Sequence, residues 1–384
     1  MIIFVPYRLM MNALKPVLPR SLSWFSVLPL LLISGCDFVT DPPELIQEYA
    51  SVWTLETRPP EDWQVSFGYS SSLRLLPDGQ VLVSTAYNIG IGDGYATRFL
   101  KVTPEGMVSK EATVDGYAGF PVIATDGTIV ALSDSLRRFS TDLEPISVYA
   151  RGLGRFGMLA FNDELMLYSD YMLSSMALAA YDFSGNQLWS KPARAMGCGG
   201  NLMLIDMLGP NAGMFARSVG PETDTLRFSA FRLSDGKSLW TKTYMSDKLF
   251  GPNPVAPRLV WKPEAQAAWV FAGDGVAEKI HVRSISRDGI GTKFTADLSG
   301  HPFEGLLEGF RTVDNGFLFG LNGNLITDAY AYRLAKTDAR GNVGWVGTFT
   351  TPGIDFLVDM LELQDGTVIV LTGRGTVSAY KPQY

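Results

Sequence analysis

Three residues near the end of the chain have the composition of a metal site: His301, Glu304 and Glu308. Zinc needs three or four ligands in tight tetrahedral geometry, and these side chains fall within eight residues of a single segment. The simpler interpretation is a polar loop that enters a strand, so no metal site is predicted. The other histidine, His281, lies inside an expected strand. With two histidines and no recognisable Ser–His pairing, the sequence gives no support to a triad hydrolase.

The two cysteines suggest different chemistry. Cys198 lies in the segment GCGGN, and a thiol without a partner is more often a small buried hydrophobe than a reactive group. Cys36 follows Ile33, Ser34 and Gly35 directly after an apolar run. It is therefore the candidate for modification, and Cys198 then has no disulfide partner.

Residues 1–35 have the features of a signal peptide. Arg8, Lys15 and Arg20 precede WFSVLPLLLI, an apolar run too short to span a bilayer. The Ile-Ser-Gly-Cys segment resembles the lipobox of bacterial lipoproteins. That resemblance implies acylation (palmitate) of Cys36, a tether over residues 36–50 and a lipid-anchored protein of the cell envelope on the periplasmic side. Inner and outer membrane stay open, because the sorting role of Asp37 differs between lineages. A simple secretory signal with a chance cysteine is the alternative.

The composition favours a β-rich globular body. Hydrophobic residues make up 46% of the chain, charged residues 18% and aromatic residues 12%, with 39 glycines. Without residues 1–35, 29 basic residues face 39 acidic ones, a net charge of −10. Such a protein gains nothing from phosphate-backbone attraction, so we expect no nucleic-acid partner.

A hairpin motif recurs along the chain and must organise these residues. YDFSGNQLWSK begins at Tyr181, FRLSDGKSLWTK at Phe231 and KTDARGNVGWVG at Lys336. Each copy has an alternating strand, a polar turn with glycine, and a second strand with Trp at a fixed place. A hairpin that returns about every fifty residues indicates a repeat architecture. The tryptophans are expected to pack between repeats.

The repeats predict an all-β fold over residues 51–384: a β-propeller of about seven four-stranded antiparallel blades. The last unit lacks one strand, and Ser51–Thr57 (SVWTLET) has no unit of its own. We therefore expect this N-terminal strand to complete the last blade and close the ring, which removes exposed sheet edges. Six or eight blades and two stacked β-sandwich domains are the alternatives.

The SGNQLW and SDGKSLW segments resemble propellers built from pyrroloquinoline-quinone-type repeats, in which the Trp docks between neighbouring blades. The resemblance implies an architecture and not a chemistry. Quinone-dependent alcohol dehydrogenases with this repeat carry an adjacent cysteine pair beside the cofactor, and this chain has none. A quinoprotein enzyme is therefore disfavoured and no cofactor is predicted.

The binding surface is predicted on the face where the chain enters each blade, because longer loops on a rigid ring usually carry function. The candidate residues at these entries are Tyr69, Tyr117, Phe120, Arg155, Asn253, His301, Glu304 and Asp355. The favoured function is a membrane-anchored scaffold that binds an envelope protein. Binding of a small ligand or glycan in the central channel is one alternative. An enzyme of the lactonase, glycosidase or quinoprotein type is the other, and no catalytic residue is assigned.

Overall fold

In the computed structural model the chain forms two units, residues 1–45 and 46–384, and only parts of the second are described here. The described residues are 48–57, 64–65, 71–88, 94–116, 118, 121–124, 126–132, 135–151, 157–161, 166–170, 177–182, 186–192, 202–208, 211–219, 225–245, 249–250, 259–264, 267–323, 331–350 and 356–383. No helix within these ranges is long and apolar enough to cross a membrane.

The described strands form seven antiparallel sheets, which we number as blades in chain order. Blade 1 contains β2 (Gln64–Val65), β3 (Ser72–Leu75), β4 (Val81–Asn88), β5 (Tyr95–Val102) and β6 (Val108–Asp115). Blade 2 contains β7 (Val122–Ile123), β8 (Ile129–Leu132), β9 (Ser135–Phe139) and β10 (Pro145–Arg151). Blade 3 contains β11 (Gly157–Phe161), β12 (Met166–Asp170), β13 (Ala177–Tyr181) and β14 (Gln187–Pro192).

The other four blades repeat the four-stranded pattern. Blade 4 contains β15 (Leu202–Met207), β16 (Ala212–Val219), β17 (Thr225–Arg232) and β18 (Ser238–Met245). Blade 5 contains β19 (Leu259–Glu264), β20 (Ala267–Asp274), β21 (Lys279–Ser286) and β22 (Gly289–Asp297). Blade 6 contains β23 (Phe303–Arg311), β24 (Phe317–Gly323), β25 (Ala331–Thr337) and β26 (Val343–Thr350). Blade 7 contains β27 (Leu357–Glu362), β28 (Val368–Thr372), β29 (Thr376–Gln383) and β1 (Glu48–Glu56).

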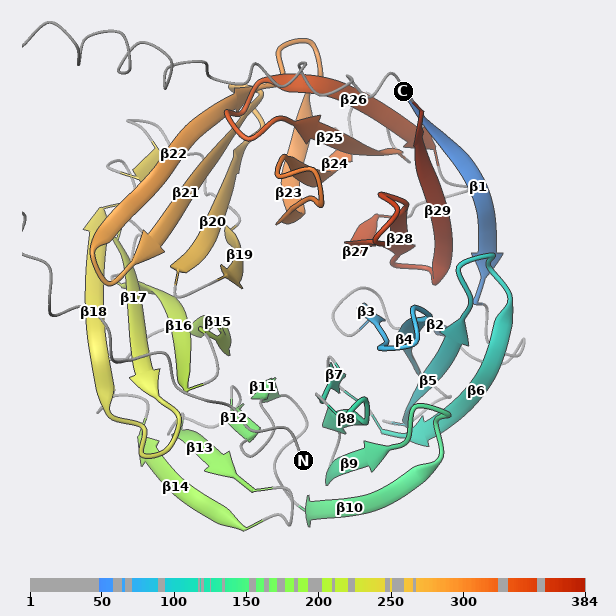
Figure 1. The fold of residues 1–384 in the computed structure, drawn as a ribbon, viewed down its shortest axis with the longest axis vertical. Helices are drawn as coiled ribbons and strands as arrows, with labels where there is room; N and C mark the ends of the chain where they lie inside the picture. The colour runs from blue at the N-terminus through green and yellow to red at the C-terminus, as the bar shows by residue number, and fades with distance from the viewer. Residues whose placement is uncertain are drawn as a thin grey trace, which may run out of the picture. The chain divides into compact units, whose positions relative to one another are not determined.

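The blades of residues 46–384 close into a ring (Figure 1). The innermost strand of each blade contacts the innermost strand of the next, and β27 of blade 7 contacts β3 of blade 1. The outermost strands, from β6 round to β1, follow one another along the circumference. This is a β-propeller, as the sequence predicted, and the blade number agrees with the expected seven.

The first described strand closes the ring, as predicted. β1 pairs antiparallel with β29, with Glu48 opposite Gln383 and Glu56 opposite Thr376. Apolar residues of blades 7 and 1 then form one buried cluster, which includes Val377, Ala379, Val81 and Val83. The ends of the propeller are thus joined both by main-chain hydrogen bonds and by apolar burial.

A β-bulge recurs in the outer strands and explains the fixed place of the tryptophans. In β1 the register shifts between Ser51 and Trp53, and the same shift precedes Trp189, Trp240 and Trp345. A bulge bends its strand and redirects the next side chain. The Trp53 indole nitrogen donates to the Pro104 carbonyl of blade 1 at 2.7 Å.

Trp189, in the outer strand of blade 3, uses the same geometry three blades farther round the ring. Its indole nitrogen donates to the Leu233 carbonyl at 2.6 Å. Leu233 lies in the turn between the third and fourth strands of blade 4, which we call the outer turn of a blade. The ring lies against Gly236, where a Cβ would come within 2.9 Å of it. Gly236 also has φ +63°, a conformation that favours glycine. Gly236 therefore allows both the positive φ of the turn and the close approach of the Trp189 ring. The predicted packing of Trp189 between blades is confirmed.

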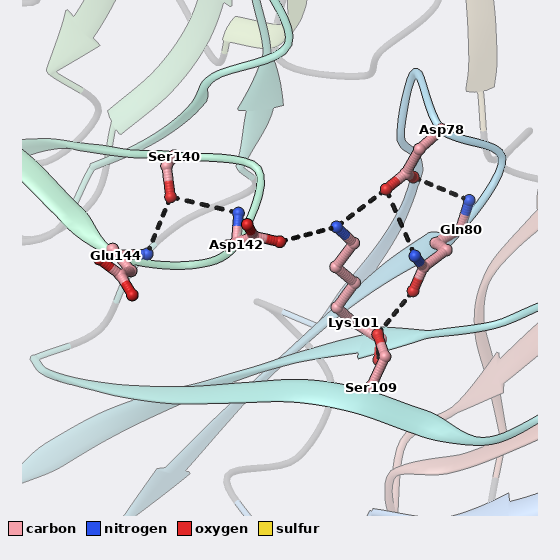
Figure 2. Close-up of polar contacts among 7 residues, drawn as sticks. All are labelled: Asp78, Gln80, Lys101, Ser109, Ser140, Asp142 and Glu144. Atoms are coloured by element: carbon pink, nitrogen blue, oxygen red, sulfur yellow. Dashed lines mark hydrogen bonds and ion pairs between the residues drawn. The ribbon is translucent and has the colours of Figure 1, made fainter.

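Between blades 1 and 2 an ion-paired lysine takes the place of a docked tryptophan (Figure 2). The Lys101 ammonium of β5 lies 2.8 Å from the Asp78 carboxylate and 3.3 Å from Asp142, which belongs to the outer turn of blade 2. Gln80 donates to Asp78 through its main-chain and side-chain nitrogens. Lys101 is 4% exposed, so a nearly buried cation connects two blades.

Candidate functional site

The connections between strands fall on two faces of the propeller. Because the strands of each blade are antiparallel, the connection from the first to the second strand and, in blades 1 to 6, that from the third to the fourth strand lie at the same end of the sheet, which we call the turn face. The remaining connections, including the entry to each blade, lie at the opposite end, the entry face. Each face can therefore be compared along the whole ring.

Charged groups on the turn face are largely paired with one another. Cations of the third strand contact the aspartate of the first turn in four blades: Lys101 with Asp78, Arg138 with Asp126, Lys336 with Asp314 and Lys381 with Asp365. Burial acts to raise the pKa of Asp314, but hydrogen bonds from Lys336, Thr312 and the Gly316 amide outweigh it. Its pKa therefore lies below the ordinary value. The described turns thus use their charges within the ring.

The best-defined part of the entry face lies between blades 5 and 6, where residues 274–279 meet residues 297–304. We call it the entry corner. Gly275 packs so closely on the Phe303 carbonyl that no Cβ could fit between them. The Glu278 carboxylate accepts a hydrogen bond from the Gly300 amide at 2.6 Å, and the Glu278 carbonyl accepts one from the Leu298 amide at 2.8 Å. Each of the two segments thus holds the other in place.

Three arginines of third strands donate hydrogen bonds to main-chain carbonyls of segments on the entry face. Arg98 donates to the Thr57 carbonyl at 3.0 Å, Arg283 to the Leu249 carbonyl at 2.6 Å and Arg333 to the Pro302 carbonyl at 2.6 Å. Burial lowers the pKa of Arg283, whose other hydrogen bonds also go to main-chain carbonyls. A guanidinium remains charged under such a shift, so these arginines act as multiple hydrogen-bond donors that position backbone.

The entry corner exposes one large apolar side chain. Val276, at the tip of the β20–β21 turn, is 82% exposed. The turn that carries it is fixed by Gly275, by Glu278 and by the Ala277 amide, which donates to Asp274 at 2.9 Å. Val276 is therefore an apolar projection on an ordered base. Sequence reasoning missed it, although the Asp274-Gly275 pair is a turn signal that could have located it.

His301 and Glu304 both belong to the entry corner. The His301 amide donates to the Leu298 carbonyl at 2.8 Å, and its side chain is half-buried. Glu304 lies at the start of β23 and is exposed. The other predicted residues lie outside the described ranges: Cys36, Tyr69, Tyr117, Phe120, Arg155, Cys198, Asn253 and Asp355.

Among the described residues no group of three or more His, Cys, Asp or Glu side chains could hold a metal ion. His281 lies in β21 beside Thr295, and burial, followed by the charge of Arg283, lowers its pKa. The entry corner is an ordered surface with one large apolar side chain exposed.

No family model matches the sequence, and no curated protein matches it. The chain is similar in structure to the WD40 β-propeller domain of Doa1, with a TM-score of 0.54, 11% identity and coverage of 88% of this chain and 98% of that one. Streptogramin B lyase gives a TM-score of 0.55 at 11% identity, covering 86% and 98%. YCF48 from Cyanidioschyzon merolae gives 0.54 at 10%, covering 86% and 99%. These similarities define the class, a β-propeller, and the variety of the neighbours leaves its function open.

Proposed function

We propose that this protein is a membrane-anchored lipoprotein of the cell envelope whose propeller binds a protein partner through its entry face. Cys36 carries the acyl anchor, residues 37–47 connect it to β1, and the entry corner contributes to the binding surface. Two or more acyl chains hold a protein stably on a bilayer, whereas one gives only marginal binding.

The observation that carries the proposal is the entry corner. Val276 is 82% exposed, while Glu278, two residues farther on, accepts a hydrogen bond from the Gly300 amide in the β22–β23 connection. A side chain that is already ordered loses little conformational entropy on binding, which favours association. The turn face, in contrast, pairs its lysines and aspartates with each other.

Site-specific photo-crosslinking in intact cells tests the binding role. A photoreactive residue replaces Val276 on the entry face or, as the matched control, Met107 on the turn face, which is 63% exposed. We expect one defined polypeptide adduct from position 276 and none from position 107. Equal protein adducts at both positions, or none at position 276, would contradict the entry-face assignment. A small-molecule adduct at 276 would favour ligand binding instead.

A second experiment tests the anchor separately. The full chain is fractionated with its membranes, and its N-terminal peptide is measured by mass spectrometry. We expect Cys36 as the first residue with acyl chains attached, and Cys36→Ser should leave the protein in the soluble fraction. If Cys36 is unmodified and the protein does not fractionate with membranes, the lipoprotein part of the proposal is wrong. The crosslinking test of the binding face is not affected by that outcome.

A further inference from the structure

The N-terminal end of the propeller, at Glu48, lies on the turn face and not on the entry face. Glu48, the first residue of β1, pairs with Gln383, while Glu56 at the other end of the strand pairs with Thr376. Thr376 follows the β28–β29 turn at Gly375, which belongs to the entry face. β1 therefore runs from the turn face to the entry face, and any segment before Glu48 is attached at the turn-face rim of blade 7.

Apolar side chains are exposed on the rim beside this attachment point. Val52 is 54% exposed in β1, and Met107 and Val108 are 63% and 42% exposed at the start of β6. Ile146, at the start of β10, is 53% exposed. The three outer strands follow one another along the circumference (Figure 1). The four residues are spread over the outer strands of three successive blades, and Leu188, Leu239 and Ile290 are similarly exposed on blades 3 to 5. We call the four residues of blades 7, 1 and 2 the rim patch.

Blades 7 and 1 are held together where the patch lies. The Trp53 indole, next to Val52, donates to Pro104 and packs on Gly106, the residue before Met107. The patch therefore belongs to an ordered junction. A loose loop could turn its apolar residues inward, but here Val52 and Met107 are held at the surface.

The charges around the patch are few and mostly paired. Lys101 is paired with both Asp78 and Asp142, and exposed Lys110 and Glu105 add one charge of each sign. With exposed Glu144 close to Ile146, the rim carries a small net negative charge. An anionic lipid surface therefore adds no attraction, and the contact depends on burial of the apolar side chains.

The distance from the anchor also limits how far the rim can lie from the bilayer. Twelve residue steps separate Cys36 from Glu48, and an extended chain spans about 3.3–3.6 Å per residue, so the two are at most about 40 Å apart. The entry face lies a full strand length farther along β1. The turn-face rim of blade 7 is thus the point at which a tether from Cys36 joins the ring.

We propose that the rim patch of Val52, Met107, Val108 and Ile146 rests on the lipid headgroup boundary and so turns the entry face away from the membrane. The inference rests on the proposed lipid anchor. An anchored protein held in this orientation presents the entry corner to partners in the aqueous compartment. The membrane contact is interfacial, because four apolar side chains insert to the depth of the headgroups and not across the bilayer.

Depth-dependent fluorescence quenching tests the orientation in the full lipidated chain. Single cysteines replace Met107 or, as an exposed entry-face control, Val276, in a Cys198→Ser background, and each carries an environment-sensitive fluorophore. The proteins are placed in vesicles of phosphatidylethanolamine and phosphatidylglycerol with headgroup spin labels. We expect several-fold stronger quenching and a blue-shifted emission at position 107. Equal quenching at both positions, or stronger quenching at 276, overturns the inference.

Hydrogen exchange of the unlabelled protein gives an independent readout. Residues 104–108 should exchange more slowly in vesicles than in detergent, while residues 274–278 stay unchanged; the reverse pattern overturns the inference. The outcomes distinguish the two proposals. If the protein does not sediment with vesicles, both the proposed lipid anchor and this orientation are wrong. If it sediments but shows equal quenching at both positions, the anchor proposal stands and only the rim contact is wrong.

Discussion

Two kinds of contact, aromatic and ionic, are seen where an outer turn meets the neighbouring blade. At three junctions an aromatic side chain of the outer strand packs on a turn glycine of the next blade: Trp53 on Gly106, Trp189 on Gly236 and Phe294 on Gly341. Between blades 1 and 2 the position after the bulge holds Lys110, and Lys101 reaches Asp142 instead. Both kinds of contact hold neighbouring sheets together in the ring.

The turn residue changes together with the kind of junction. In the outer turn of blade 2 the positive-φ position is taken by Leu143, with φ 63°, and this side chain is 4% exposed. A leucine at positive φ is strained by about 1 kcal/mol or more. It is tolerated because no aromatic ring docks there, so the side chain can fill the core beside Leu76 and Phe139. The glycine and the aromatic residue are thus a matched pair.

The largest effect is expected for the aromatic junction that closes the ring. Trp53→Ala should lower the free energy of unfolding by about 3 kcal/mol, because it removes a large half-buried side chain and its hydrogen bond to Pro104. Trp189→Ala is the matched variant inside the ring. Chemical denaturation should show similar losses, but only Trp53→Ala should increase hydrogen exchange in β1 and β29. Unchanged exchange in these two strands would argue against a closing role of Trp53.

The next prediction separates backbone strain from aromatic docking. Gly106 and Gly79 have nearly equal φ, +86° and +81°, but a Cβ at Gly106 would lie 2.5 Å from Trp53, whereas Gly79 has open space. Gly79→Ala should cost about 1 kcal/mol from strain alone. Gly106→Ala should cost about 2–3 kcal/mol, since strain and overpacking add. Equal losses in thermal or urea unfolding would disprove the pairing of glycine and aromatic residue.

A smaller loss is expected at the ionic junction. Lys101→Met should cost about 1–2 kcal/mol, because it leaves the Asp78 and Asp142 carboxylates without their common cation while both remain partly hydrated. Lys381→Met is the control, since Lys381 and Asp365 are both 54% exposed and such pairs contribute about 0–1 kcal/mol. Equal effects of the two substitutions would show that burial of Lys101 adds nothing to the junction.

The two kinds of junction should also differ in their response to acid. Burial raises the pKa of Asp78, but hydrogen bonds from Lys101 and the Gln80 amide outweigh it, so the pKa is below its ordinary value. A depressed carboxyl pKa gives stability that is complete above the unfolded value, near 3.8, and is lost as the pH falls through the folded value. Amides of residues 140–144 should therefore gain exchange below about pH 4 before those of residues 105–107, the turn on which Trp53 packs. Simultaneous opening of both turns would refute this difference.

The smallest effect concerns blades 6 and 7, and it has the opposite sign. Glu362 accepts a hydrogen bond from the Val313 amide at 2.8 Å, and burial raises its pKa. A carboxyl whose pKa is raised by folding stabilises the protein more as the pH falls. Glu362→Gln keeps an acceptor without the charge, so it should raise stability at neutral pH by less than about 1 kcal/mol. A loss of stability at neutral pH would contradict this account.

Much of the fold followed from local patterns in the sequence. Turn pairs such as Asp78-Gly79 and the recurring Gly-to-Trp spacing are local signals, and they predicted the hairpins and the ring. The unmatched Ser51–Thr57 segment predicted closure, and the observed strand begins three residues earlier, at Glu48. The bulge before each tryptophan was not predicted, because it depends on pairing with the neighbouring strand.

The entry corner could be predicted only in part. His301 and Glu304 stand out in the sequence because histidine is scarce and carboxylates are chemically distinctive. Val276 carries no such signal, since its exposure arises from the packing of Gly275 on Phe303 and from the Glu278–Gly300 hydrogen bond. These contacts join two blades, so no local pattern encodes them. The ionic junction at Lys101 was missed for the same reason.

The pairing of β1 with β29 has a consequence for the order of folding. Glu48 and Gln383 are more than three hundred residues apart, so the last blade cannot be completed until the chain has been made as far as Gln383. Long-range pairing is slow, because a large loop must close before its contacts form. Until then β29 exposes an unpaired edge that invites association with other strands. We therefore expect ring closure to be the late, rate-limiting step of maturation and the stage at which chaperones are most needed.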